Sequence, residues 1–297
     1  MRLLRALLSW RSAGYLAYGL TLLVLLLYAR FPADKFKQFC ENRLGSLLTD
    51  SACAIDRIDY QLPLTLTFFG VHLRKITESG ASELTLDRLS LALESAGKPA
   101  TFTLTGALYG GQVSAHLAVG DFARGRIAMN DIRLVGLDAA ALQKDLGRVD
   151  RKISGTFSFT GEYQADARDF AGGIGEGRVE MATGTVALLQ PVLSLNQIVF
   201  HHLSGNIRYE KNKLTIRDGV LKGTDLIGDF SGTVALSDSY SQSELQLGGR
   251  LVPQAAFLIA HPQEEKMVQA VMKRYNMTTL PFRIGGTLTS PIFRLSN

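Results

Sequence analysis

Glycine-punctuated alternation is the feature that most constrains this chain. From Ala54 onward, short runs of alternating apolar and polar residues recur, as in "LTLTFFGVHL" (64–73), with a glycine every ten to twenty residues. Successive side chains of a strand point to opposite faces, so this period of two predicts sheets with one apolar and one polar face. The chain has 29 glycines but only 8 prolines, which suits many strands joined by tight turns.

Two segments carry this pattern with local detail. In "ELTLDRLSLALE" (83–94) the leucine alternation changes phase at Asp87-Arg88, which predicts a bulge or bend in a strand. In "NIRYEKNKLTI" (206–216) two alternating runs flank the polar pair Lys211-Asn212, which predicts a β-hairpin.

Helical patterns are few. Residues 31–48 begin with Pro32 and place Phe36, Phe39, Cys40 and Leu44 on one face, which predicts a helix. Residues 137–146 read as a short helix with Asp138 near its start. Residues 253–275 read as mostly helical but broken at Pro262.

The pattern therefore predicts an all-β fold, mainly antiparallel, as an extended curved sheet or a sandwich with a few short helices. The absence of βαβ alternation disfavours a Rossmann fold or an α/β barrel. The apolar face has three ways to be buried: against a second sheet, by curling on itself, or as a trough that holds another molecule. The segment "GGIGEGR" (172–178) is a candidate subdivision of the β-rich region.

An uncharged stretch near the N-terminus predicts one transmembrane helix. Residues 12–29 lack charge and span roughly 27 Å as a helix, close to the thickness of a bilayer core. The expected anchor runs from Ser12 through Leu20 and Leu25 to Ala29. Three arginines precede it, which favours an N-terminus in the cytoplasm. A cleaved signal peptide and a buried globular helix are the alternatives, but "YARFPADKF" lacks an Ala-x-Ala cleavage pattern.

These elements predict three regions: a cytoplasmic tip and anchor (1–30), a juxtamembrane helix (31–52) and a β-rich domain across the membrane (53–297), with the candidate subdivision near 172. Cys40 and Cys53 are the only cysteines. Outside the cytoplasm they are candidates for a disulfide worth about 3 kcal/mol. The alternative is two unrelated small apolar side chains.

Catalytic and cofactor motifs are missing from the sequence. The five histidines (His72, His116, His201, His202 and His261) lack metal-site spacing, and "GGIGEGR" lacks the GK[ST] ending of a phosphate loop. The chain has no GxSxG elbow either. Basic residues form no block after the anchor, so the net charge of +5 does not indicate nucleic acid. We expect a protein that is not an enzyme, with no cofactor and no metal.

The chain resembles the type II secretion system protein N (GspN) family, and more distantly AsmA-like proteins. The resemblance rests on the arginine-flanked anchor followed by "FPADKFKQF", on "LSGNIRYEKNKLTIRDGVLKGTDLIGDFSGTVALSD" (203–238) and on the closing "LPFRIGGTLTSPIFRL". It implies a single-pass inner-membrane protein of a Gram-negative bacterium with a periplasmic β domain. Its expected function is an accessory role in type II protein secretion through contacts with other secretion components.

The AsmA-like resemblance supplies the alternative function, in which an apolar β-groove binds or transfers lipid acyl chains. Alternations such as Leu84/Leu86 and Val186/Leu188, without enough helices to cover a broad sheet, favour it. The C-terminal segment 280–297 adds a structural prediction. It should form the closing hairpin, with Phe282, Ile284, Phe293 and Leu295 on the apolar side, sealing either a core or the end of a groove.

Overall fold

The computed structural model describes residues 14–19, 21–22, 32–47, 51–61, 64–77, 80–120, 125–145, 152–166, 169–192, 195–237, 242–275 and 278–295. Residues 14–19 and 21–22 of the expected anchor are helical. Ser12, Leu20, Leu25 and Ala29 lie outside the described residues. Among the helices that are described, none is both long enough and apolar enough to cross a membrane.

The described part of the chain forms one sheet of fourteen antiparallel strands. Their spatial order is their order in the sequence, so every connection joins neighbouring strands. The strands are β1 (Ser51–Gln61), β2 (Thr65–Thr77), β3 (Gly80–Ser95), β4 (Ala100–Leu108), β5 (Gly111–Val119), β6 (Arg126–Asp138), β7 (Ile153–Asp166), β8 (Asp169–Val192), β9 (Leu195–Glu210), β10 (Lys213–Gly223), β11 (Leu226–Ala235), β12 (Glu244–Pro253), β13 (Leu280–Gly286) and β14 (Pro291–Leu295). The mainly antiparallel β prediction is confirmed, and "GGIGEGR" lies inside β8.

The hairpin predicted over 206–216 is confirmed as the junction of β9 and β10. Lys213 pairs with Glu210, and the turn residues Lys211 and Asn212 have φ of 51° and 57°. Positive φ at both central residues is the geometry whose twist matches that of the flanking strands. The sequence therefore fixes this hairpin locally.

The phase change expected in β3 is a bend shared by three strands. Two consecutive residues of β3, Asp87 and Arg88, are exposed, and Leu89 then returns to the apolar face. The β2–β3 register is nevertheless continuous on both sides of this point. Gly70 of β2, with φ of 58°, lies at the same level, and a Cβ on it would come within 2.0 Å of the Asp56 carboxylate of β1. The adjacent strands bend together at this point, without a bulge. The apolar side chains of β3 therefore change from even-numbered positions before the bend to odd-numbered positions after it.

In the part of the chain that the structure describes, four helices flank the sheet. They are α3 (Ala33–Leu47), α4 (Ala139–Asp145), α5 (Ala255–Ala260) and α6 (Pro262–Tyr275). Asp138 caps α4, since its Oδ1 accepts hydrogen bonds from the N–H groups of Ala140 (2.8 Å) and Ala141 (3.3 Å). The predicted break at Pro262 is confirmed, because α5 ends at Ala260 and α6 begins at the proline.

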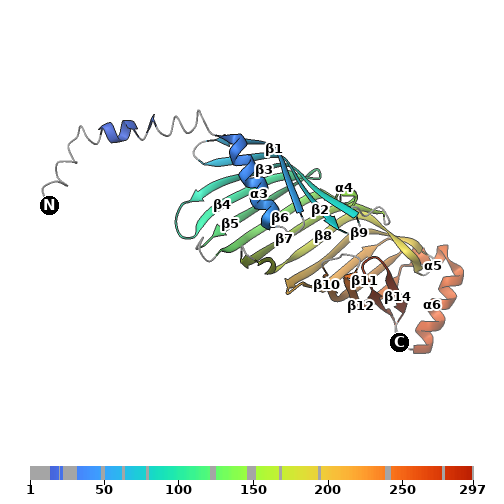
Figure 1. Ribbon diagram of the computed structural model, residues 1–297. Helices are drawn as coiled ribbons and strands as arrows, with labels where there is room; N and C mark the ends of the chain where they lie inside the picture. Colours follow the sequence, from blue (N-terminus) through green and yellow to red (C-terminus); the bar gives the residue numbers. More distant parts are fainter. Residues whose placement is uncertain are drawn as a thin grey trace.

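The helices α3 and α6 lie toward opposite ends of the sheet (Figure 1), and each packs on a buried cluster. At the first end, Phe36 and Cys40 of α3 pack on Ile55, Ile58 and Val71. At the second end, α6 packs its Val268 and Met272 on Leu251, Leu280 and Phe282. The helices thus supply at each end the cover that a second sheet would supply in a sandwich.

The apolar face expected for the first helix is only partly right. Phe36 and Cys40 contact the sheet, but Phe39 is 61% exposed. At 100° per residue, position 39 lies 60° from position 36 on the side away from position 40, so it falls outside the contact stripe. The side chain of Leu44 lies outside the described residues.

Candidate apolar binding site

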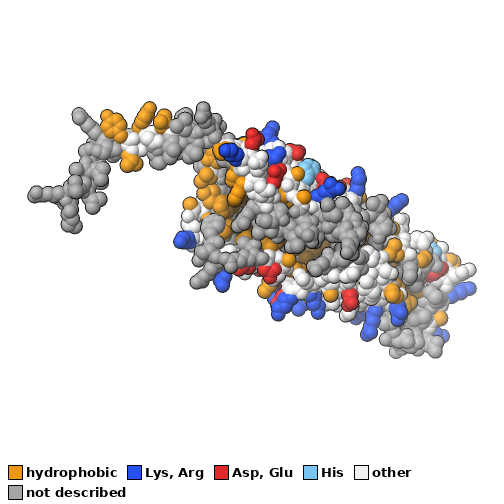
Figure 2. Space-filling model, viewed as in Figure 1, with side chains coloured by type: hydrophobic (Ala, Val, Ile, Leu, Met, Phe, Trp, Pro, Cys, Tyr) orange, Lys and Arg blue, Asp and Glu red, His pale blue; other side chains and the backbone are white. Residues whose placement is uncertain are grey.

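The two faces of the sheet differ in chemistry, as the alternation predicts. The outer face carries exposed ion pairs, among them Arg178–Glu180 (2.7 Å) and Arg250–Asp229 (3.3 Å). The inner face carries aliphatic and aromatic side chains. Figure 2 shows hydrophobic side chains gathered in the hollow beside α3, with charged side chains along the rim. Between the two end clusters most described inner-face residues, such as Leu91 and Leu104, are only half-buried.

An apolar cavity of about 360 Å³ lies on the inner face toward the C-terminal end of the sheet. Strands β8 to β14 all contribute to it. Its lining consists of Val186, Leu188, Leu189, Ile198, Phe200, Leu203, Leu221, Gly228, Asp229, Phe230, Leu247, Leu251, Phe282, Ile284, Pro291 and Phe293. Asp229 is the one charged residue in this lining, and its carboxylate bonds to Arg250 on the outer face. The cavity therefore offers a ligand apolar surface rather than polar side-chain partners.

The C-terminal hairpin forms one wall of this cavity. Phe282 and Ile284 of β13 and Phe293 of β14 line it, while Arg283 and Arg294 are exposed. The rings of Phe282 and Phe293 stack at 5.6 Å. β14 also lies against β8, six strands away in sheet order, so this end of the sheet curls back on itself. The hairpin prediction is confirmed, but the covered position expected for Leu295 is wrong, because this last residue of β14 is 41% exposed. The hairpin borders a cavity as well as the cluster under α6.

Glycines lie beneath the large rings of the cavity lining. A Cβ at Gly184 would meet the Phe200 ring at 2.6 Å, and a Cβ at Gly219 would meet the Phe230 ring at the same distance. Each ring therefore covers a neighbouring strand at a point where that strand has no side chain. In the sequence, the regular spacing of the glycines is the signal for this packing of rings over glycines.

The glycine-rich segment of β8 serves the same packing and holds no phosphate-loop geometry. Gly173 and Gly175 lie under the ring of Tyr163, and Gly177 lies under Phe159. The pKa of Tyr163 is raised, and burial of the hydroxyl is the largest cause. The Tyr163 hydroxyl donates to the carbonyl of Phe170. We conclude that these glycines make room for aromatic rings.

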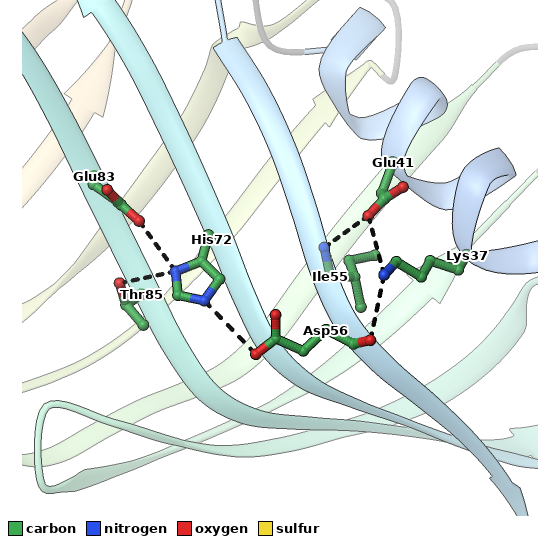
Figure 3. Close-up of polar contacts among 7 residues, drawn as sticks. All are labelled: Lys37, Glu41, Ile55, Asp56, His72, Glu83 and Thr85. Atoms are coloured by element: carbon green, nitrogen blue, oxygen red, sulfur yellow. Dashed lines mark hydrogen bonds and ion pairs between the residues drawn. The ribbon is translucent and has the colours of Figure 1, made fainter. Parts of the chain in front are cut away.

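Polar side chains join α3 to the edge of the sheet (Figure 3). Glu41 Oε1 accepts a hydrogen bond from the backbone N–H of Ile55 at 2.9 Å. Lys37 Nζ donates to the backbone carbonyl of Asp56 at 3.3 Å. Both bonds engage backbone groups of the edge strand β1. The sequence periodicity did not predict this contact. It indicates the apolar face of α3, but not the backbone groups to which the polar side chains bond.

The cysteines are brought together by the same contact. Cys40 of α3 and Cys53 of β1 pack on one cluster, and both are free thiols in the structure. Burial is the largest cause of a raised pKa at each thiol, followed by the nearby Glu41 carboxylate. The disulfide expected between them stays a prediction.

The histidines lie in separate places. His72 bonds to Glu83 (3.1 Å) and lies 3.9 Å from Asp56, on the exposed face of β1 to β3 (Figure 3). His116 pairs with Glu94 at 3.4 Å, and His201 bonds to Thr224 at 3.2 Å. In the part of the chain that the structure describes, no three His, Cys, Asp or Glu side chains form a group that could hold a metal ion.

A polar hollow of about 640 Å³ lies on the outer face across β6 to β10. It contains Arg178, Arg208 and Arg217 together with Glu162 and Glu176. Arg208 pairs with Glu176 at 3.5 Å, so charges of both signs are interleaved.

The chain matches no family model, no curated protein and no solved structure.

Proposed function

We propose that this protein is a non-enzymatic binding module of the bacterial envelope that holds a lipid acyl chain on the inner face of its sheet. The observation that carries the proposal is the 360 Å³ cavity with its apolar lining. Its volume lies within the range of about 300–1,000 Å³ usual for ligand sites.

The chemistry of the lining favours an acyl chain over a polar ligand. A polar group placed there would lose its hydrogen bonds to water without replacing them, at a cost of roughly 1–3 kcal/mol. A methylene gains about 0.8 kcal/mol on burial. Each methylene of a buried acyl chain therefore makes binding more favourable.

The shape of the sheet favours a long, narrow occupant. At about 4.8 Å per strand spacing, fourteen strands extend for roughly 60 Å. Half-buried apolar side chains such as Leu91 and Leu104 continue the inner face toward α3. An extended chain can use such a stripe.

Native mass spectrometry of the full chain, released from detergent micelles, tests the proposal. We expect the wild type to carry an acyl lipid. Val186→Trp fills the cavity from β8 and should lower the bound fraction at least about tenfold, because a Trp side chain occupies the volume of several methylenes.

The matched control is Val135→Trp, the same substitution at an outer-face position that is 55% exposed. It should retain the lipid at the wild-type level. A wild type that carries no lipid, or a Val186→Trp variant that carries as much as the control, would contradict the proposal.

The accessory role in type II secretion is a second candidate, favoured by the polar hollow on the outer face. Interleaved Arg and Glu side chains suit a protein partner of complementary charge. A photo-crosslinking residue at Thr160, inside the hollow, should capture a secretion component in cells. The same residue at Gln112, exposed on β5 outside the hollow, should not. Equal capture at both positions, or none, would count against this role.

A further inference from the structure

The helix α3 holds the edge strand β1 through two kinds of contact. Lys37 and Glu41, one helical turn apart, bond to the backbone of Asp56 and Ile55. Phe36 and Cys40, also one turn apart, pack on the apolar cluster of Ile55, Ile58 and Val71. The polar stripe thus covers the open edge of the sheet while the neighbouring stripe covers its apolar end.

Cys40 and Cys53 both lie within this contact. Cys53 lies two residues before Ile55, so both point to the inner face of β1, where Cys40 packs from the helix. Both thiols pack on the same buried cluster of Ile55, Ile58 and Val71, which places them on one side of the contact between α3 and β1. The pair therefore bridges two elements, and no other cysteine competes for either thiol.

We propose that Cys40 and Cys53 are a redox-active thiol pair whose oxidation to a disulfide fastens α3 to β1. The oxidant is a disulfide-bonded dithiol protein or a small disulfide of the glutathione class. This assignment does not depend on what the apolar face binds.

The exchange is balanced. The thiolate of one cysteine attacks the oxidant disulfide, forming a mixed disulfide and releasing one oxidant thiol. The thiolate of the second cysteine then attacks the mixed disulfide, forming the Cys40–Cys53 bond and releasing the second oxidant thiol. Two electrons pass to the oxidant, and the two protons lost by the cysteines are taken up by its thiols.

The environment of the pair suits a controlled reaction. Burial and Glu41 raise the pKa of both thiols, so little thiolate is present at neutral pH. Exchange with an oxidant disulfide is then slow at neutral pH and becomes faster as the pH rises. In the reduced protein α3 is held by the side-chain contacts alone. Its release would expose the N–H of Ile55 and an apolar cluster at a sheet edge, a surface prone to pairing with another strand.

The test uses the full chain in detergent, reduced and then treated with oxidised glutathione as the probe. Intact mass should show the loss of two hydrogen atoms without retained glutathione, and maleimide-polyethylene glycol should label neither cysteine. Cys40→Ser and Cys53→Ser should each keep one glutathione. Trypsin should cleave after Lys37 at least about tenfold more slowly in the oxidised wild type than in the reduced wild type.

The reduced and the oxidised protein both have the wild-type sequence, so this comparison does not depend on the folding of a variant. The Cys40→Ser/Cys53→Ser double variant should be cut at the rate of the reduced wild type under both conditions. Glutathione retained on both cysteines, two thiols that stay unmodified, or equal cleavage of oxidised and reduced wild type would each overturn the proposal.

Discussion

At the scale of single residues, glycine allows two neighbouring strands to approach closely. Gly249 of β12 pairs with Phe230 of β11, and a Cβ there would come within 2.0 Å of the carbonyl oxygen of Asp229. A Cβ on the neighbouring Gly248 would have its nearest atom at 3.6 Å. Two adjacent glycines thus have different roles, and only one of them is required by its surroundings.

We expect Gly249→Ala to lower the free energy of unfolding by about 1–3 kcal/mol, because the strands must separate to admit the methyl group. Gly248→Ala should change it by less than about 1 kcal/mol, with a gain from reduced unfolded-state entropy as one component. Urea unfolding followed by circular dichroism measures both. Equal losses for the two variants would show that the close approach at Gly249 is unimportant.

At the scale of elements, the sequence predicted the elements defined by local signals. Asp138 caps α4, Pro262 separates α5 from α6, and Lys211-Asn212 turns β9 into β10. It did not predict how α3 reaches the edge strand, since Glu41 and Lys37 bond to backbone groups that any sequence carries. Nor did it distinguish a sandwich from a single curved sheet, because period-two alternation reports an apolar face and not what covers it.

Tyr109 joins α4 to the sheet and makes that contact sensitive to pH. Its hydroxyl accepts from the N–H of Thr85 at 3.4 Å and bonds to the Asp145 side chain. Burial is the main cause that raises the pKa of Tyr109 to about 12, with Asp145 acting in the same direction. In the unfolded chain the hydroxyl ionises near its ordinary value of 10.

Between these two values the unfolded state binds fewer protons than the folded state, so stability falls as pH rises from about 10 to about 12. Tyr109→Phe should flatten this fall, and its thermal midpoint should depend less on pH across this window than that of the wild type. Identical pH profiles for the two proteins would refute the role of Tyr109. Below pH 9 neither protein should show this dependence.

At the scale of the whole molecule, one sheet replaces a closed core. Helices cover the two ends, the C-terminal hairpin borders the cavity, and most described residues of the inner face between them are half-buried. The apolar alternation of the sequence specified which residues face inward. The cavity arises from the curl that brings β14 against β8, which depends on the summed twist of many strands and has no local signal.

Removing residues 289–297 should therefore affect both stability and binding. The deletion eliminates β14 and the stacking of Phe293 on Phe282, and it opens the cavity wall. We expect a thermal midpoint lowered by several degrees and loss of the bound lipid. A chain that ends at Leu295 is the matched control and should behave as the wild type. An unchanged midpoint in the shorter chain would show that the hairpin does not seal the sheet.

The most direct test of an acyl chain on the inner face is site-specific photo-crosslinking in living cells at two adjacent residues of β9. Ile198 lines the cavity, whereas Gln197 is exposed on the outer face. A photoreactive amino acid at position 198 should yield an adduct with the mass of an acyl lipid, and the same amino acid at position 197 should not. Lipid adducts at both positions, or at neither, would contradict binding in the cavity.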